Sequence, residues 1–140
     1  MPHDHVPSRD HLLLAAGGAL AGLGVALGAF AAHGLRGRLA PDMLEVFHTA
    51  AQYQLLHGIA IVAVAGAMSH FDRARLRAAC WLFVAGIGLF SGSLYLLALT
   101  GTRWLGAITP LGGVAFLAGW VMVVLGARKV GKAGGREGER

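Results

Sequence analysis

The side chains best suited to chemistry in this sequence are a histidine, a tyrosine and two glutamines set in an apolar segment. His57 follows Tyr53 by four residues and Gln54 by three, so on a helix these three side chains would share one face. An imidazole can bind a metal or carry a proton near neutral pH. Together with selected polar residues in the apolar segments or at their ends, they form the candidate ligand-binding set: His33, Gln52, Tyr53, Gln54, His57, Ser91, Ser93, Tyr95 and Thr109.

Three interpretations of this set are open: hydrogen-bonded contacts that hold helices together, a path for a ligand or an ion, or a metal or haem site at His57. His33, His48 and His57 lack HxxxH or HExxH spacing, so the sequence does not favour a metal site. A hydrolytic triad would need an acidic partner, and the apolar segments contain none. The single cysteine, Cys80, excludes an internal disulfide and a CxxC site. We therefore expect no catalytic residue, no metal ligand, no cofactor and no enzymatic activity.

Four apolar stretches must position these side chains. Of the 140 residues, 56% are hydrophobic and 14% are charged, whereas a soluble domain carries about 25% charged residues. Charged residues are absent from 12–32, 49–68, 78–100 and 104–127, and about 20 residues span a bilayer core. Each stretch is expected to be a helix, because lipid offers no partner to backbone polar groups. The sequence predicts an all-α polytopic membrane protein, a four-transmembrane-helix bundle, and excludes a soluble enzyme, a nucleic-acid binder and a disordered linker.

Basic residues outside these stretches predict how the helices cross the membrane. Nine would lie on the side that carries both termini, against three on the other side, namely Arg36, Arg38 and Arg103. The positive-inside rule then places both termini in the cytoplasm. We expect the protein to lie in the bacterial inner (plasma) membrane. In this topology the candidate residues lie between the midplane and the outer end of the bundle. Residues 1–11 are expected to form a polar tail and 128–140 a basic flexible tail, and the net charge of +5 indicates contact with membrane lipids and not with nucleic acid.

Glycine and proline predict how the helices begin, bend and meet. Pro110 stands about two turns into the fourth stretch and is expected to kink it. Pro41 and Asp42 are typical of a helix start, so 41–48 is predicted to run directly into the second span from the interface. Glycines at four-residue spacing let two helix backbones approach closely, and they occur as Gly18/Gly22, Gly24/Gly28 and Gly88/Gly92.

Four ordered motifs resemble those of one protein family. They are AFAAHGL at 29–35, TAAQYQLLH at 49–57, FSGSLY at 90–95 and ITPLGG at 108–113. The chain resembles the family known as domain of unknown function 423 over roughly residues 10 to 127. Ala31 and Gly58 stand where that family more often has glycine and alanine, which are small-for-small changes. The resemblance implies a four-span integral membrane protein, and it implies no particular reaction, substrate or cofactor.

Three functions are compatible with these features. The first is a structural or partner subunit that packs through glycine-rich helices against itself or against a larger membrane complex. The second is a small oligomeric transporter or channel subunit with a polar site in the outer half of the membrane. The third is a cofactor- or quinone-type binding protein built around His57 and Tyr95. The first is the main hypothesis.

Overall fold

The computed structural model describes residues 9–127, which form helices and their connections. The helices are α1 (Arg9–His33), α2 (Pro41–Ala67), α3 (Arg73–Gly86), a π-helical turn η1 (Ile87–Ser91), α4 (Gly92–Thr100), a 3-10 helix η2 (Arg103–Ala107) and α5 (Thr109–Gly126). Four continuous segments are long and apolar enough to cross a membrane: Asp10–His33, Pro41–Ala67, Arg73–Thr100 and Arg103–Gly126. The predicted all-α, four-span architecture is confirmed.

The two expected tails lie almost entirely outside the described residues. The described part begins at Arg9, and residues 9–11, expected to belong to the polar tail, form the first turn of α1. The basic tail expected at 128–140 falls wholly outside the described range.

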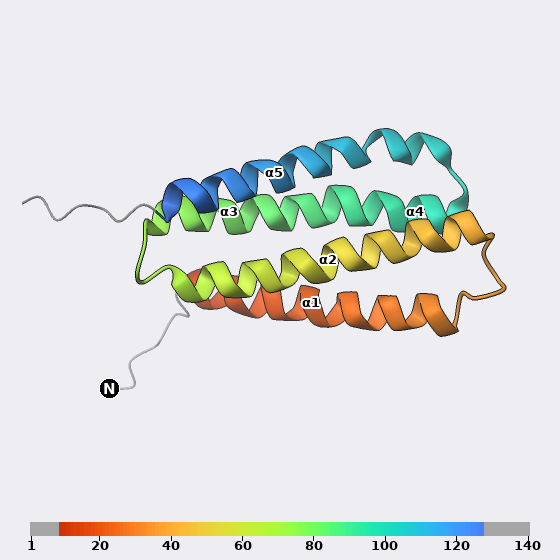
Figure 1. The fold of residues 1–140 in the computed structure, drawn as a ribbon, viewed down its shortest axis with the longest axis horizontal. Coiled ribbons are helices and arrows are strands. Elements are labelled where there is room, and N and C mark those ends of the chain that lie inside the picture. The colour runs from red at the N-terminus through yellow and green to blue at the C-terminus, as the bar shows by residue number, and fades with distance from the viewer. Residues whose placement is uncertain (1–8, 128–140) are drawn as a thin grey trace, which may run out of the picture.

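The four spans lie side by side in chain order and alternate in direction (Figure 1). α1 packs against α2, α3 packs against α5, and α2 packs against both α3 and α4. α2 and α3–α4 are therefore the inner spans, and α1 and α5 are the outer ones. The start of α1, the α2–α3 connection and the end of α5 lie together at what we call the terminal end, and the other two connections lie at the far end (Figure 1).

Glycines set the distance between the paired helices. A Cβ at Gly58 in α2 would lie 2.6 Å from the backbone nitrogen of Ala21 in α1, and one at Gly24 would lie 2.9 Å from the nitrogen of Leu55. Two helix backbones can approach this closely only where one residue has no side chain, so the contact between α1 and α2 depends on glycine. The predicted glycine pairs divide accordingly: Gly24/Gly28 faces α2, whereas a Cβ at any residue of the other two pairs, Gly18/Gly22 and Gly88/Gly92, would meet nothing within 4 Å.

Two predictions about individual helices can be compared with the structure. α2 begins at Pro41 and continues without a break to Ala67, which confirms the predicted helix start and its run into the second span. The predicted kink at Pro110 is wrong, because η2 ends at Ala107 and Pro110 lies in the first turn of α5. A proline is accommodated there, since the first N–H groups of a helix have no partner within the helix.

The buried core runs mainly between the two inner spans. Its larger part, towards the terminal end, includes Ile61, Cys80, Phe83 and Phe116, and Cys80 is fully buried as a free thiol. A smaller cluster around Phe47 lies towards the far end. These two clusters hold α2 against α3 and α4, and so determine which polar side chains of the inner spans can meet.

Candidate functional site

The inner helix α2 carries the central polar residues on its buried face. Gln54 and His57, three residues apart, are both buried. Tyr53 was expected on the same face, but it is 40% exposed, and Gln52 is exposed as well. The polar residues of α2 therefore divide between the protein interior and the lipid-facing surface.

Gln54 joins three helices through its amide. Its Nε2 donates a hydrogen bond to the carbonyl oxygen of Leu20 in α1 at 3.0 Å. Its Oε1 accepts one from the Tyr95 hydroxyl in α4 at 2.9 Å. The Tyr95 ring also packs on Phe47, with ring centroids 4.7 Å apart. The amide thus has partners at both ends and stabilises the junction of α1, α2 and α4.

His57 has a partner at each ring nitrogen. The indole Nε1–H of Trp120 in α5 donates to its Nε2 at 3.3 Å. An indole N–H can only donate, so Nε2 is the acceptor and Nδ1 carries the proton. Nδ1 then donates to the carbonyl oxygen of Tyr53 at 2.9 Å, and the ring stacks on Phe116 at a centroid distance of 3.6 Å. These contacts hold a neutral imidazole in one tautomer, with both nitrogens engaged within the protein.

A third polar contact lies near the start of α5. Ser93 donates to the carbonyl oxygen of Phe90 at 3.0 Å, and its oxygen lies 2.8 Å from the Thr109 hydroxyl. Since a serine has one O–H, Thr109 donates to Ser93. Ser91, in the π-helical turn, is fully buried, and its Oγ has no hydrogen-bond partner among the described residues. A π-helical turn is often found at a functional position, but this hydroxyl is enclosed.

The nine candidate residues therefore do not meet in one place. The structure brings together Gln54 with Tyr95, and Ser93 with Thr109. Tyr53 and His57 lie instead beside the aromatic rings of α5. His33, at the end of α1, and Gln52 are exposed, and Ser91 is enclosed.

Aromatic residues around His57 are a feature of the site that the polar residues of the sequence did not indicate. They line an open groove of about 480 Å³ between α2 and α5. The sequence feature that could have indicated this groove is the spacing of Phe116 and Trp120, which are four residues apart and share a face of α5. The spacing of polar residues does not show which aromatic rings surround the imidazole. The lining of the groove comprises Tyr53, Leu56, His57, Phe90, Pro110, Gly113, Val114, Phe116, Leu117 and Trp120.

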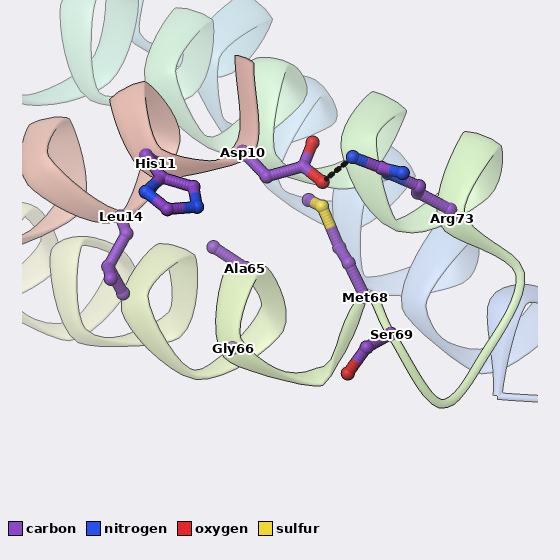
Figure 2. A pocket seen from close by; sticks show the side chains of 8 residues that line it. All are labelled: Asp10, His11, Leu14, Ala65, Gly66, Met68, Ser69 and Arg73. Carbon is purple, nitrogen blue, oxygen red and sulfur yellow. Dashed lines mark ion pairs between the residues drawn. The ribbon is translucent and has the colours of Figure 1, made fainter. Parts of the chain in front are cut away.

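A second hollow, of about 330 Å³, lies at the terminal end between α1 and the end of α2 (Figure 2). His11 lies at one side of it, and the ion pair of Asp10 with Arg73 at the other (Figure 2). Asp10 also accepts a hydrogen bond from Arg77 at 3.0 Å. One carboxylate on α1 is thus held by two guanidinium groups on α3. In the sequence these arginines indicated only the topology, because their partner Asp10 lies more than sixty residues away along the chain.

Among residues 9–127, no three His, Cys, Asp or Glu side chains lie close enough together to hold a metal ion. The buried polar side chains Gln54 and His57, together with Tyr95, are uncharged groups that are hydrogen-bonded to one another, to backbone carbonyls and to Trp120. The arrangement joins helices, and the aromatic groove and the charged hollow at the terminal end are both open to the surroundings.

These features define a multi-pass, all-α membrane protein with four spanning helices. A family model described as "Protein of unknown function (DUF423)" matches residues 27–113. The chain belongs to this family.

The relatives of this chain are membrane proteins by name. It is 48% identical over 108 residues to the UPF0382 membrane protein YwdK of Bacillus subtilis, with 76% of this chain and 88% of that protein covered. It is 45% identical over 108 residues to a UPF0382 membrane protein of Staphylococcus saprophyticus, with 77% and 89% covered. A UPF0382 membrane protein of Staphylococcus haemolyticus is 44% identical over 107 residues, with 76% and 87% covered. No solved structure matches the chain.

Proposed function

We propose that this protein is a structural or partner subunit of the bacterial inner (plasma) membrane, without enzymatic activity. The observation that carries the proposal is the hydrogen bonding within the spans. Gln54 and His57, the buried polar residues of α2, both have partners on neighbouring helices. Side chains engaged in this way stabilise the packing of helices and are not free to bind a substrate.

The proposed orientation has both termini in the cytoplasm. The terminal end carries Arg73, Arg75 and Arg77 in the first two turns of α3. The far end has Arg36 and Arg38 in the α1–α2 connection and Arg103 in η2. When the basic residues of 128–140 are added, the terminal end has more basic residues than the far end. This excess supports a cytoplasmic location for the terminal end.

The outer face of α1 is the proposed contact with a partner. Small exposed residues follow one another there at helical spacing: Ala15, Gly18, Gly22, Ala26 and Ala29. A Cβ on Gly18 or Gly22 would meet nothing within 4 Å, so these glycines are not required for packing within the chain. A stripe of small residues lets another transmembrane helix approach closely. The partner is a second copy of this chain or a helix of a larger membrane complex.

Cross-linking in membranes tests this proposal. A cysteine replaces Ala15 in a Cys80→Ala background, and oxidative cross-linking is followed by gel electrophoresis with and without Gly22→Leu. The expected result is a cross-linked product of defined mass that Gly22→Leu abolishes. The matched control is Gly88→Leu, which changes an equally open glycine in η1 and should leave the product intact. Absence of a product, or equal loss in both variants, would contradict the proposal.

One observation favours a second candidate, a protein that binds a flat, lipid-soluble ligand of the quinone type. The aromatic groove places Tyr53, His57 and Trp120 around a space of about 480 Å³. Native mass spectrometry of the gently solubilised protein, with His57→Ala as the variant, separates the two functions. A bound small molecule that is lost in a folded His57→Ala protein would support the ligand. Loss of folded protein alone would support the structural role of His57.

A further inference from the structure

The terminal end combines an excess of positive charge with an apolar groove that starts beside it. Three arginines of α3 face two carboxylates there: Asp10 pairs with Arg73 and Arg77, and Asp72 pairs with Arg75. One positive charge therefore stays unbalanced among these five side chains. A charge of this kind at the edge of a bilayer attracts anionic lipid.

The groove lies between α1 and α3 and has a volume of about 490 Å³. Arg77, Trp81 and Val84 line it from α3, at a spacing of four and three residues that places them on one helix face. Leu12, Leu13 and Ala16 line it from α1. The groove is thus apolar along its length, and its charged member is Arg77, nearest the terminal end.

Along this face of α3, the side chains come in the same order as the parts of a phospholipid. A charged group is followed by an aromatic ring suited to the interface, and then by apolar side chains. Arg77 comes first, with one amino group bound to Asp10 and about a third of its side chain (34%) still exposed. A guanidinium group has further N–H donors that fit phosphate oxygens. Trp81 comes one turn deeper and is 59% exposed, and tryptophan favours the level of lipid headgroups and the adjoining carbonyls. Val84 and Ala16 follow towards the hydrocarbon, where an acyl chain would lie.

We propose that this groove is a binding site for one anionic phospholipid, with the headgroup phosphate on Arg77 and an acyl chain between α1 and α3. Asp10 limits the affinity of the site, because its carboxylate holds Arg77 and Arg73 and offsets part of their charge. The site is separate from the outer face of α1 and from the aromatic groove, so the proposal does not depend on the proposed function.

The test is native mass spectrometry of the detergent-solubilised protein titrated with phosphatidylglycerol or phosphatidylcholine of the same acyl chains. The wild-type protein is expected to retain one phosphatidylglycerol in preference to phosphatidylcholine. Arg77→Gln should lower the ratio of the two by about fivefold, the effect expected for one basic residue at a membrane surface. Asp10→Asn should raise the ratio, because it frees two guanidinium groups.

The opposite expected changes of the lipid ratio in Arg77→Gln and Asp10→Asn distinguish a lipid site from an ion pair with only a structural role. If the Asp10 contacts only hold α1 on α3, then Asp10→Asn and Arg77→Gln should both destabilise the protein and neither should change lipid preference in the folded fraction. Arg75→Gln is the matched control, because Arg75 pairs with Asp72 and donates to the carbonyl of Leu125, away from the groove. The proposal is overturned if Arg75→Gln lowers the ratio as much as Arg77→Gln, if Asp10→Asn lowers it, or if a second copy of the chain occupies the groove in place of lipid.

Discussion

Replacing either of two adjacent glycines in α5 by alanine should change the free energy of unfolding, in opposite directions at the two positions. A Cβ at Gly112 would lie 2.7 Å from Cβ and 2.8 Å from Cα of Phe90, whereas one at Gly113 would meet nothing within 4 Å. Ordinary van der Waals contact begins at 3.4 Å, and the backbone nitrogen of Phe90 lies nearer to this Cβ than either carbon does. Gly112→Ala therefore requires the backbones of α5 and η1 to separate by more than about 0.7 Å. Phe90 also packs on Tyr53 and Phe116, so the displacement extends into the aromatic groove.

The expected magnitudes follow from two opposing terms. Replacing glycine by alanine within a helix favours the folded state by about 0.5 to 1 kcal/mol, and this gain applies to both positions. Overpacking costs about 1 to 3 kcal/mol, and it applies only at Gly112. Gly113→Ala should therefore raise the free energy of unfolding slightly, and Gly112→Ala should lower it by about 1 to 2 kcal/mol.

Cys80 provides the assay, because it is the single cysteine of the chain and is fully buried. Its rate of labelling by a maleimide across a titration with sodium dodecyl sulfate reports the fraction of unfolded protein. The midpoint for Gly112→Ala should fall well below that of the wild-type protein, and that for Gly113→Ala should equal or exceed it. Equal midpoints for the two variants, or the reverse order, would refute the assignment of Gly112 to the α5–η1 contact.

Three further predictions concern single side chains. Tyr95→Phe removes the hydroxyl that donates to Gln54 and should lower the free energy of unfolding by about 0.6 kcal/mol, and by no more than about 1.7; Tyr53→Phe, measured by the same titration, should change it less. Gly101 has a φ of +69°, so Gly101→Ala should lower the free energy of unfolding by about 1 to 2 kcal/mol, and Gly101→Asn should lower it less. An equal loss of stability in the two variants, measured by thermal unfolding, would argue against the left-handed turn. Cys80 in the folded protein should react with maleimide far more slowly than a cysteine placed at Val124, which is exposed on α5; equal labelling rates in detergent would contradict its burial.

The main features of the fold could be predicted because they depend on local properties of the chain. Four long apolar stretches require four helices, since each backbone must satisfy its own hydrogen bonds in lipid. The helix start at Pro41 follows from the fixed φ of proline and its missing N–H. The prediction at Pro110 was wrong because apolar composition does not distinguish a 3-10 helix from the α-helix that follows it. The sequence could show that this segment is long enough to cross the membrane, but not where within it α5 begins.

The candidate site depended on information that a single helix does not contain. Gln54 meets Tyr95 from 41 residues away, and His57 meets Trp120 from 63 residues away. Both contacts depend on how far each helix is rotated about its axis and how deep it lies beside its neighbour. Spacing within α2 could indicate which polar residues share a face, but not which aromatic rings of α5 that face would contact.

The sequence by itself determined the class of the protein, its four helical spans and the distribution of charge between the two ends, because apolar length and charge are properties of consecutive residues. The tertiary structure alone decided that Gly112 is enclosed while Gly113 is open, that the polar residues separate into several contacts, and that Asp10 meets two arginines of α3. The physical reason is the same in each case. Contacts between helices are set by the rotation and depth of each helix against its neighbours, and these follow from the packing of side chains on several helices at once.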